Sequence, residues 1–480
     1  MSVPHRLGCA TLVAFVMLGL GSARAAERPA IETSTTATGP DGDAVVVGAP
    51  LPRGPDGEHQ RADRPDVDGR DEPGPTVGEA MLWVPRVVFS PVYLVTEFVI
   101  RRPVGWVMTI AERDQWPAFV IDLFTFGPKR NVGVVPTAFV DFNFRPSIGV
   151  YVFANDAWVK GHDIRAQFGF GGLSWWLAAL SDRWMLTDDL RLDLGFRFAL
   201  RPDNVFHGLG PDSLFDNRSR FRSRRTRGSV ALRQDLFGRG ELLLESSIED
   251  VHFNTTDTAF KDDDPSLREA IALGFYEAPP GLDGYFVLRT RVDARIDSRR
   301  DVRENGTGVS GRVTTGYSTD LNDRQRREWV ILGAGLAGHL DVGHNRILSL
   351  GGYAANFFST GRDPIPFTEL PTSGTSALIL GAFLPGRLVG SSIAGAAFEY
   401  RYDIWALIDG RAFFSVGNVF GPEFEQFDVE RLRMSYGLGF ASVGDPDASF
   451  NFLVAFGHET FEQGSGLDSV RFLIGFQPDI

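Results

Sequence analysis

The stretch LRLDLGFRFALR, residues 190–201, decides the fold because apolar and polar side chains alternate along it. Its even-numbered positions are all Leu or Phe, whereas its odd-numbered positions are Arg, Asp, Gly and Ala. A period of two puts each set on its own face of an extended strand. Residues 284–297 repeat the alternation and carry Arg and Asp on the polar face. Both stretches therefore predict β-strands with one apolar face and one polar face.

Two all-β architectures use strands of this kind. In a soluble sandwich the polar face meets bulk water, whereas in an outer-membrane barrel the apolar face meets lipid and the polar face lines a lumen. The chain has 480 residues and 39 Phe, and it starts with an export signal. The apolar run 7–20 and the pattern Ala23-Arg24-Ala25 predict a signal peptide over residues 1–25. These features favour the barrel and a location in the cell outer membrane.

Seventeen stretches after residue 131 are strand candidates. Single-chain bacterial barrels close with an even number of strands, because both termini usually lie on the periplasmic side. The weakest candidate is 267–276, where Asp264 and Pro265 resemble a helix cap and a first-turn residue, so we assign it to a short helix or loop. The prediction is an all-β, 16-stranded antiparallel transmembrane β-barrel over residues 132–480. Its strands are expected at 132–142, 147–156, 163–171, 174–182, 190–201, 220–234, 240–253, 284–297, 308–319, 326–340, 345–358, 391–402, 406–418, 431–442, 448–457 and 470–477.

Two segments separate the signal peptide from the barrel. Residues 26–80 are rich in Pro, Asp and Gly and lack aromatic side chains, which predicts a disordered linker. Residues 81–131 form an amphipathic, partly helical segment in which prolines interrupt an aromatic-rich sequence. The prolines and charges make this segment too broken to cross a membrane as a helix. Two placements stay open, one at the membrane interface and one in the mouth of the barrel.

Composition and motifs argue against covalent chemistry. The formal net charge of −13 disfavours nucleic acid as a partner. The only thiol, Cys9, lies in the signal peptide, and the eight His are scattered, so no metal site is expected. Residues 333–338 match GxGxxG, but no helix pattern follows, so we expect Gly333, Gly335 and Gly338 to face the lumen and make room for a loop there. We predict no catalytic residue, no cofactor and no metal, and hence no enzyme.

A dense basic cluster stands at the start of the strand expected at 220–234. One interpretation is a hydrated rim. The other is a set of guanidinium groups that pair with phosphates of outer-membrane lipid, lipopolysaccharide included, because Arg binds phosphate through two parallel hydrogen bonds. The residues proposed for this lipid-phosphate rim are Arg222, Arg224 and Arg225.

The longest late connection, about 360–390, shows no strand pattern, and a loop of this length in a compact body is usually functional. Six short pieces surround it in a fixed order. They are 206–213 (FHGLGPDS), 297–299 (DSR), 370–372 (LPT), 386–387 (GR), 399–401 (EYR) and 417–420 (GNVF). In order and spacing they resemble the BamA/TamA outer-membrane assembly factors, the bacterial surface-antigen family. The family's pattern of eleven strands, a long loop and five more strands also matches.

The resemblance implies that the long loop folds back into the lumen. In the family an Arg at the loop tip pairs with an Asp of a wall motif. Here the matching tip is Leu380, Gly381, Ala382 and Phe383, and the matching wall is 413–417, so both charged partners are absent. We expect Phe383, together with Arg387 after Gly386, to hold the loop, with Arg387 against Glu399. The expected wall residues are Glu399, Arg401, Phe413, Ser415 and Gly417.

The resemblance also implies a function. Family members insert or translocate proteins or lipids at the outer membrane, and other outer-membrane proteins are among their partners. The periplasmic repeats (POTRA domains) of the family are not recognisable in residues 27–131. We expect a weak seam between strands 132–142 and 470–477 that opens laterally. The alternatives are a passive channel or structural outer-membrane protein that has lost the assembly role, and a surface adhesin.

Overall fold

The computed structural model describes part of the chain. The described residues are 123–127, 130–237, 240–255, 264–299, 306–323, 325–343, 346–374, 379–405, 408–442 and 449–477, with Phe98, Arg102, Trp106, Ile110 and Arg113. The expected signal peptide, the linker 26–80 and most of the segment 81–131 lie outside them. No helix within these residues is both long enough and apolar enough to cross a membrane.

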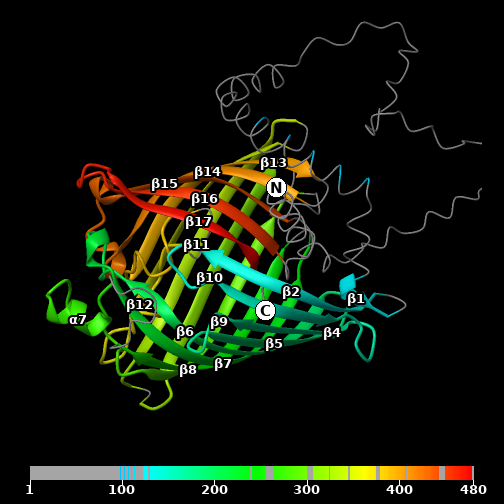
Figure 1. Ribbon diagram of the computed structural model, residues 1–480, viewed down its shortest axis with the longest axis horizontal. Helices are drawn as coiled ribbons and strands as arrows, with labels where there is room; N and C mark the ends of the chain where they lie inside the picture. Colours follow the sequence, from blue (N-terminus) through cyan, green and yellow to red (C-terminus); the bar gives the residue numbers. More distant parts are fainter. Residues whose placement is uncertain are drawn as a thin grey trace, which may run out of the picture. The chain divides into compact units, whose positions relative to one another are not determined.

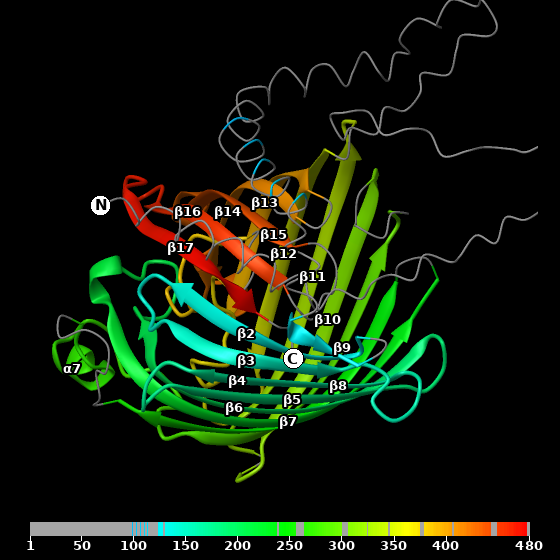
Figure 2. The ribbon, with the colours of Figure 1, turned by 45° about the vertical axis from the view of Figure 1, so that its right-hand side comes forward.

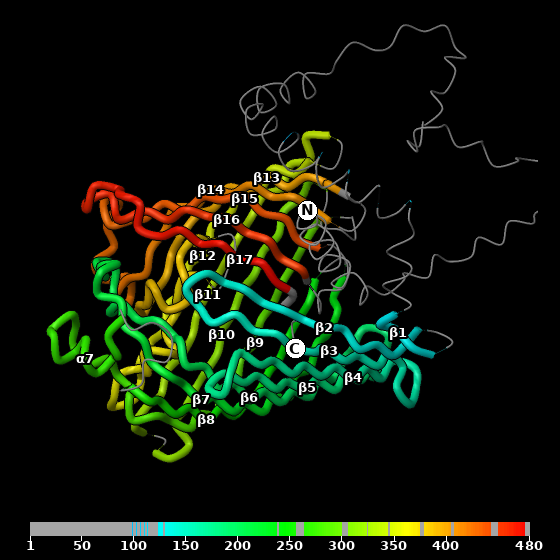
Figure 3. Tube along the Cα trace, in the orientation of Figure 1, coloured from blue at the N-terminus to red at the C-terminus, as the bar shows by residue number. Residues whose placement is uncertain are grey.

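Sixteen antiparallel strands close into one ring, in which each strand pairs with the next and β17 pairs with β2 (Figures 1 and 3). A short additional strand, β1 (Thr125–Phe126), pairs with the start of β2. The predicted 16-stranded barrel is therefore confirmed. Its strands are β2 Val132–Asp141, β3 Ser147–Ala154, β4 His162–Phe170, β5 Trp176–Met185, β6 Leu190–Phe206, β7 Ser219–Asp235, β8 Glu241–Asn254, β9 Tyr285–Asp297, β10 Gly308–Asp320, β11 Glu328–Asp341, β12 Ile347–Ser359, β13 Ser392–Trp405, β14 Ile408–Phe420, β15 Arg433–Ser442, β16 Ser449–Thr460 and β17 Leu467–Gln477.

Strand β6 is the one whose predicted end differs most from the observed end. The alternation was expected to stop at residue 201, but the strand continues to Phe206. The pairing with β7 shifts between Arg201 and Asn204, so a bulge interrupts the period of two without ending the strand. The alternation in the sequence therefore ends at the bulge, although the pairing of β6 with β7 continues beyond it.

The alternation separates the two faces of the wall. Large apolar side chains at even positions of β6, β7 and β8 are exposed on the outside of the ring, which gives the apolar belt of a membrane barrel. Charged side chains at odd positions of the same strands face the lumen, where they pair with one another. The exposed apolar residues include Leu194, Phe196, Val230, Leu232, Leu242 and Leu244.

The rejected strand candidate is a short helix, α7 (Leu267–Ala272), as predicted. The predicted cap was wrong, because Ser266 rather than Asp264 caps this helix in a reciprocal capping box with Glu269. Asp264 instead pairs with Arg218 and Arg220 at the start of β7. Leu267 anchors the helix, because it is buried in an apolar cluster with Phe206 of β6 and Phe221 of β7. The Asp264 carboxylate therefore stabilises the start of β7 rather than the helix N-terminus.

The glycines of β11 also have a different neighbour from the one expected. The aromatic ring of Tyr353, on β12, lies over Gly333 and Gly335, and a Cβ on either glycine would approach it within about 3 Å. The prediction that a loop presses against the glycines of this motif is therefore wrong. Gly333 and Gly335 accommodate a side chain of the neighbouring strand, and a Cβ on Gly338 would meet no atom within 4 Å.

Both ends of the strand series lie at the same end of the barrel, because the number of strands is even. The opposite end, called here the loop end, carries the four longest connections, 207–218, 255–284, 360–391 and 421–432. The connection 360–391 is called the lumen loop. Figure 2 shows that β17, in red, lies beside β2, in cyan, so the first and last barrel strands meet directly.

Candidate functional site

The lumen loop folds into a hairpin. Thr372 and Val389 form an antiparallel bridge, and the Ser373 amide donates to the carbonyl oxygen of Leu388 at 3.1 Å. Gly386 has a φ of +89°, and a Cβ at this position would lie 2.3 Å from the carbonyl oxygen of Val205 on β6. Only glycine combines this backbone conformation with so close an approach to the wall. The hairpin is therefore held tightly against the wall at its turn.

The tip of the hairpin bonds to serines that point inward from three strands. The Leu380 amide donates to Ser415 Oγ of β14 at 3.1 Å, and the Ala382 amide donates to Ser435 Oγ of β15 at 3.1 Å. Ser469 Oγ of β17 donates to the Ala382 carbonyl oxygen at 2.8 Å. Backbone groups that would otherwise be unpaired inside the lumen are thus satisfied by the wall. The structure places the tip beside Ser415, one of the expected wall residues.

Apolar packing completes the contact between tip and wall. The Phe383 ring is fully buried and lies over Gly457 of β16, where a Cβ would stand 2.8 Å from it. Phe413 packs with Ala382, so this expected wall residue also reaches the tip. Gly417 does not, because a Cβ there would meet the backbone of Ala394 on the neighbouring β13. Its role is close packing between strands.

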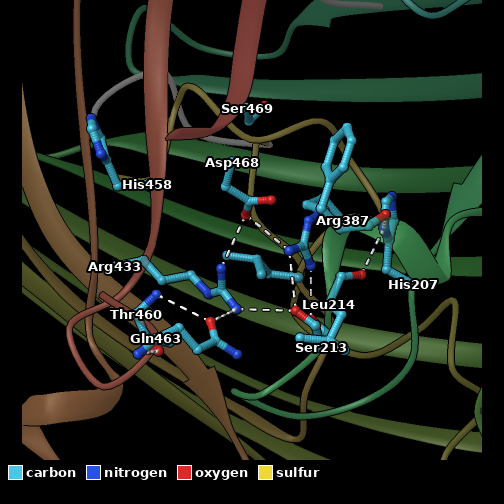
Figure 4. Close-up of polar contacts among 12 residues, drawn as sticks. His207, Ser213, Leu214, Arg387, Arg433, His458, Thr460, Gln463, Asp468 and Ser469 are labelled. Atoms are coloured by element: carbon cyan, nitrogen blue, oxygen red, sulfur yellow. Dashed lines mark hydrogen bonds and ion pairs between the residues drawn. The ribbon is translucent and has the colours of Figure 1, made fainter. Parts of the chain in front are cut away.

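The expected pairing of Arg387 with Glu399 is wrong. Arg387 binds Asp468 of β17 at 2.9 Å and Ser213 Oγ at 2.9 Å, and Arg433 of β15 binds the same Asp468 oxygen at 3.0 Å (Figure 4). Arg387, Arg433 and Asp468, called here the Asp468 cluster, are almost completely buried. A carboxylate shared by two guanidinium groups therefore ties the lumen loop to the last strand and to β15.

Sequence parity could not find Asp468. The pairing of β16 with β17 shifts between Gly457 and His458, so Asp468 and Ser469 both face the lumen although they are consecutive. Glu399 lies at another level of the wall, where Arg401 of the same strand binds it at 3.2 Å. Strand parity therefore predicted that each side chain points inward but not its position along the barrel axis.

His207 adjoins the Asp468 cluster at the end of β6 (Figure 4). Its Nδ1 lies 3.0 Å from the carbonyl oxygen of Phe215 and 3.3 Å from that of Leu214, so this nitrogen carries the proton and donates. Burial first, and then the nearby Arg387 guanidinium, hold the pKa of His207 well below its usual range. The imidazole is therefore neutral at pH 7.

Arg471 of β17 joins the lumen loop to the first strand. Its guanidinium donates to the carbonyl oxygens of Gly374, Gly381 and Phe383 at 3.1 to 3.3 Å. The same group binds Asp141 of β2 at 2.9 Å. The sequence patterns described above did not single out Arg471. The available signal for this ion pair was the presence of Arg471 and Asp141 on the inward faces of the two strands that were expected to meet.

The pairing between β17 and β2, called here the seam, is the shortest ladder of the barrel in the described residues. It has three residue pairs, Leu473 with Asp141, Ile474 with Val140 and Gly475 with Phe139. The next shortest ladder, between β3 and β4, has seven. No described strand pairs with residues 134–138 on the seam side, and Pro136, which has no N–H to donate, lies within that stretch. The seam half of β2 thus resembles an edge strand.

A second anchor fixes the lumen loop to the opposite wall. Glu369 binds Arg289 of β9 and accepts a hydrogen bond from the Tyr285 hydroxyl at 2.7 Å. Arg225 of β7 lies 3.7 Å from Glu369 and binds Glu249 at 3.2 Å. The lumen loop therefore spans the interior, with its tip on β14 to β17 and Glu369 on β7 to β9.

The rim prediction is therefore wrong for Arg225, which faces the lumen. Arg222 and Arg224 have the other parity in β7, shared with the exposed Val230 and Leu232, and Arg224 is exposed. Only Arg222 and Arg224 remain candidates for contact with lipid phosphate. The described residues contain no group of three or more His, Cys, Asp or Glu that could hold a metal ion.

Comparisons with known proteins show a structural similarity to solved barrels but assign this chain to no family. No family model and no curated protein sequence matches this chain. Among solved structures, BamA from Haemophilus ducreyi lacking POTRA domains 1–3 aligns with a TM-score of 0.49 and 13% identity over 72% of this chain and 70% of that one. CdiB from Escherichia coli aligns with a TM-score of 0.47 and 11% identity, over 71% and 62% of the two chains. CdiB from Acinetobacter baumannii gives 0.46 and 7%, over 72% and 59%.

The strand pairings themselves define the class. The protein is a sixteen-stranded antiparallel barrel with an apolar outer belt and a lumen occupied by a hairpin loop. Closed barrels of this kind are one of the two structures whose backbone can cross a membrane, because every strand finds a partner. The weakly paired seam distinguishes this barrel from one that is evenly closed.

Proposed function

We propose that this protein is an outer-membrane barrel that takes part in inserting or translocating proteins or lipids through its seam. The observation that carries this proposal is the three-pair ladder between β2 and β17. Four fewer pairs than in the next shortest ladder remove several backbone hydrogen bonds, each contributing roughly 0.5–1.5 kcal/mol. Opening at the seam therefore costs less than opening at any other ladder of the described ring.

An open seam offers something that a client chain can use. Residues 134–138 of β2 present backbone groups without a described partner strand on the seam side. In hydrocarbon, unpaired backbone groups cost several kcal/mol each, so a client strand that adds to this edge is stabilised by main-chain hydrogen bonds. A lipid-facing edge is thus a template for a new strand.

The lumen loop supports the same proposal. Arg471 binds both the tip carbonyl groups and Asp141, so the closed seam and the docked tip share one guanidinium. Movement of the tip away from β17 leaves Arg471 with Asp141 alone. We therefore assign the lumen loop the role of stabilising the closed state.

A disulfide across the seam tests the proposal. Val140→Cys with Ile474→Cys places two cysteines on directly opposite residues, whose Cα separation suits a disulfide. The only native thiol is Cys9, which lies far outside the barrel sequence. In cells that depend on the variant, oxidation is expected to lower the outer-membrane levels of other barrel proteins, and reduction to restore them.

The matched control is Val150→Cys with Phe168→Cys, an opposite pair in the full ladder between β3 and β4. Oxidation of this pair is expected to leave the levels of other barrels unchanged. Full function of the oxidised seam variant would refute lateral opening.

A passive channel is the second candidate, and one observation favours it. Lumen-facing arginines of β9 and β10 stay partly exposed, with side-chain exposures of 35% for Arg291 and 55% for Arg312. Such groups suit a water-filled space beside the lumen loop. Steady conductance of the purified protein in planar bilayers, unchanged by the seam disulfide, would support this candidate over the first.

A further inference from the structure

Five large side chains on the outside of β13 to β16 are almost completely buried. They lie at the end of the barrel opposite the loop end, beside the turns that join β13 to β14 and β15 to β16. Their positions are even-numbered, whereas the odd-numbered Ser415 and Ser435 face the lumen, so these five side chains point outward. They are called here the covered patch and are Tyr400, Tyr402, Ile408, Phe440 and Phe450.

Neighbouring strands do not explain this burial. Leu340 of β11, Leu348 of β12 and Tyr400 of β13 stand directly opposite one another across two ladders, and all three point outward. Their exposed fractions are 39%, 9% and 4%. Nearer the loop end, Phe414 of β14 and Tyr436 of β15 also point outward and are 43% and 41% exposed. Strands in one wall cover one another only from the sides, so a further element covers the patch from outside.

A helical stretch that precedes the barrel in sequence has one exposed face. Its described residues are all helical, and all except Ile110 are exposed; they are Phe98, Arg102, Trp106, Ile110 and Arg113. Intervals of three and four residues place them on one side of a helix. The Arg102 guanidinium carbon lies 4.2 Å from the centre of the Phe98 ring, one turn away. The exposed face therefore combines aromatic rings with cations.

The opposite face of this helix is aliphatic by sequence. At about 100° per residue, the positions half a turn from the exposed face carry no charge. They are Ile100, Val104, Val107, Met108 and Ala111. Aromatic and cationic side chains suit the interface between lipid and water, whereas an aliphatic face is stabilised by packing on an apolar surface. A helix with both faces fits between a protein wall and the membrane.

The chain between this helix and the barrel is long enough to reach the covered patch. Thr125 pairs with Gly133 of β2 at the end of the barrel that carries the patch. The twelve residues from Arg113 to Thr125 can span up to ~40 Å. From β2 to β13 there are five strand spacings, by way of β17, β16, β15 and β14, which amount to about 24 Å. The helix can therefore lie on β13 to β16 while its chain enters the barrel at β1.

We infer that the helical segment 98–113 lies along the outside of the barrel, with its aliphatic face on the covered patch. Of the two placements that the sequence leaves open for this region, this is the one at the membrane interface. Phe98 and Trp106 then face lipid, and Arg102 and Arg113 lie near the headgroups. The occupant of the patch is thus a segment of the same chain. This contact does not depend on opening of the seam.

A photoreactive residue in the covered patch tests the contact. Tyr402→p-benzoylphenylalanine replaces one aromatic side chain by another, and its cross-links are mapped by mass spectrometry on the purified full-length protein in detergent. The main product is expected to join residue 402 to the segment 98–113. Tyr400→p-benzoylphenylalanine repeats the test at a second site with the same expectation. Cross-links only to detergent, to copurified lipid, to a second copy or within the barrel would overturn the inference.

The matched control uses an exposed tyrosine on the same outer surface. Tyr436 of β15 points outward like Tyr402 but lies nearer the loop end, where it is 41% exposed. Tyr436→p-benzoylphenylalanine is expected to give no cross-link to the segment 98–113. Equal yields from residues 402 and 436 would show contact without a defined site and would overturn the inference.

Two further substitutions test which face of the helix is docked. Val104→Asp puts a charge on the aliphatic face and is expected to lower the yield of the cross-link from residue 402 about tenfold, because burial of an unpaired carboxylate is costly. Thr109→Asp puts the same charge on the side of Phe98 and Arg102 and is expected to leave the yield unchanged. Heat-modifiable migration in electrophoresis checks that both barrels are folded. Equal yields in these two variants would overturn the assigned orientation.

Discussion

Two parts of the barrel wall line the same lumen with different chemistry. On β6 to β10 the inward side chains are charged and pair across strands, as Arg291 does with Glu245 at 2.9 Å. On β14 to β17 the lumen loop packs directly on small inward residues, Ser415, Ser435, Gly457 and Ser469, called here the small-residue wall. The difference teaches that strand alternation indicates which way a side chain points. The size and charge of that side chain indicate whether it meets water or protein in the lumen.

The charges of the Asp468 cluster beside the small-residue wall are almost completely buried, and the largest expected effect follows from their burial. Asp468→Ala leaves the guanidinium groups of Arg387 and Arg433 without a carboxylate inside the protein. Loss of one partner from such a cluster costs roughly 3–5 kcal/mol. The free energy of unfolding in urea, measured on the barrel in detergent, is expected to fall by that amount.

The matched control comes from the charged wall. Asp293→Ala removes the partner of Arg312, whose side chain is 55% exposed and can be hydrated instead. The expected loss is below about 1 kcal/mol, because exposed ion pairs contribute little. Equal losses in the two variants would mean that both walls meet the same solvent, and the comparison would fail.

The second prediction concerns the contact of the lumen loop with the charged wall. Glu369→Gln removes the charge between Arg289 and Arg225, although both arginines keep Glu249 nearby. We expect a loss of roughly 2 kcal/mol in the free energy of unfolding. We also expect larger steady conductance, since this end of the lumen loop is released. Unchanged conductance would show that the tip alone determines how the lumen is filled.

The third prediction tests the small-residue wall through Phe383. Gly457→Val places a side chain where the ring now lies, and overpacking of this kind costs about 1–3 kcal/mol. Gly338→Val on β11 is the control, because no atom lies within 4 Å of a Cβ there. The melting temperature is expected to fall only for the first variant, and a similar fall in both would contradict close packing of Phe383 on β16.

The smallest predicted effect is a dependence on pH. The pKa of His207 lies well below its usual value in the folded protein and returns to about 6.5 on unfolding. Between these two values the unfolded state binds more protons, so stability rises with pH and is complete above about pH 6.5. As the pH falls below 6.5, the free energy of unfolding is expected to drop by at most about 1.4 kcal/mol per pH unit.

Substitution of the imidazole isolates this effect. His207→Gln keeps a side chain that can donate to the carbonyl groups of Leu214 and Phe215 but cannot be protonated. Its unfolding free energy is expected to vary less with pH between 6.5 and 5 than that of the native protein. An identical pH profile would place the titrating group elsewhere.

The strands were predictable because a period of two is a property of neighbours in sequence. Position along the lumen was not, and Arg387 illustrates the reason. Both Arg387 and Glu399 were expected to face the interior, yet the bulge before Ser469 brings Asp468 to Arg387 instead. Contacts that depend on register, bulges and the height of a loop are set by the closed ring as a whole. The sequence alone therefore predicted the tip and its wall better than the ion pairs between them.

Arg471 has a consequence for the order in which this barrel is made. It belongs to β17, the last barrel strand, and its guanidinium supplies the donors for three carbonyl groups of a hairpin about ninety residues earlier in the chain. Until β17 is in place, the tip lacks these three hydrogen bonds and Asp141 lacks its cation. Capture of the hairpin and completion of the ring are thus one event. A chain truncated before residue 471 would remain unfinished in both respects at once.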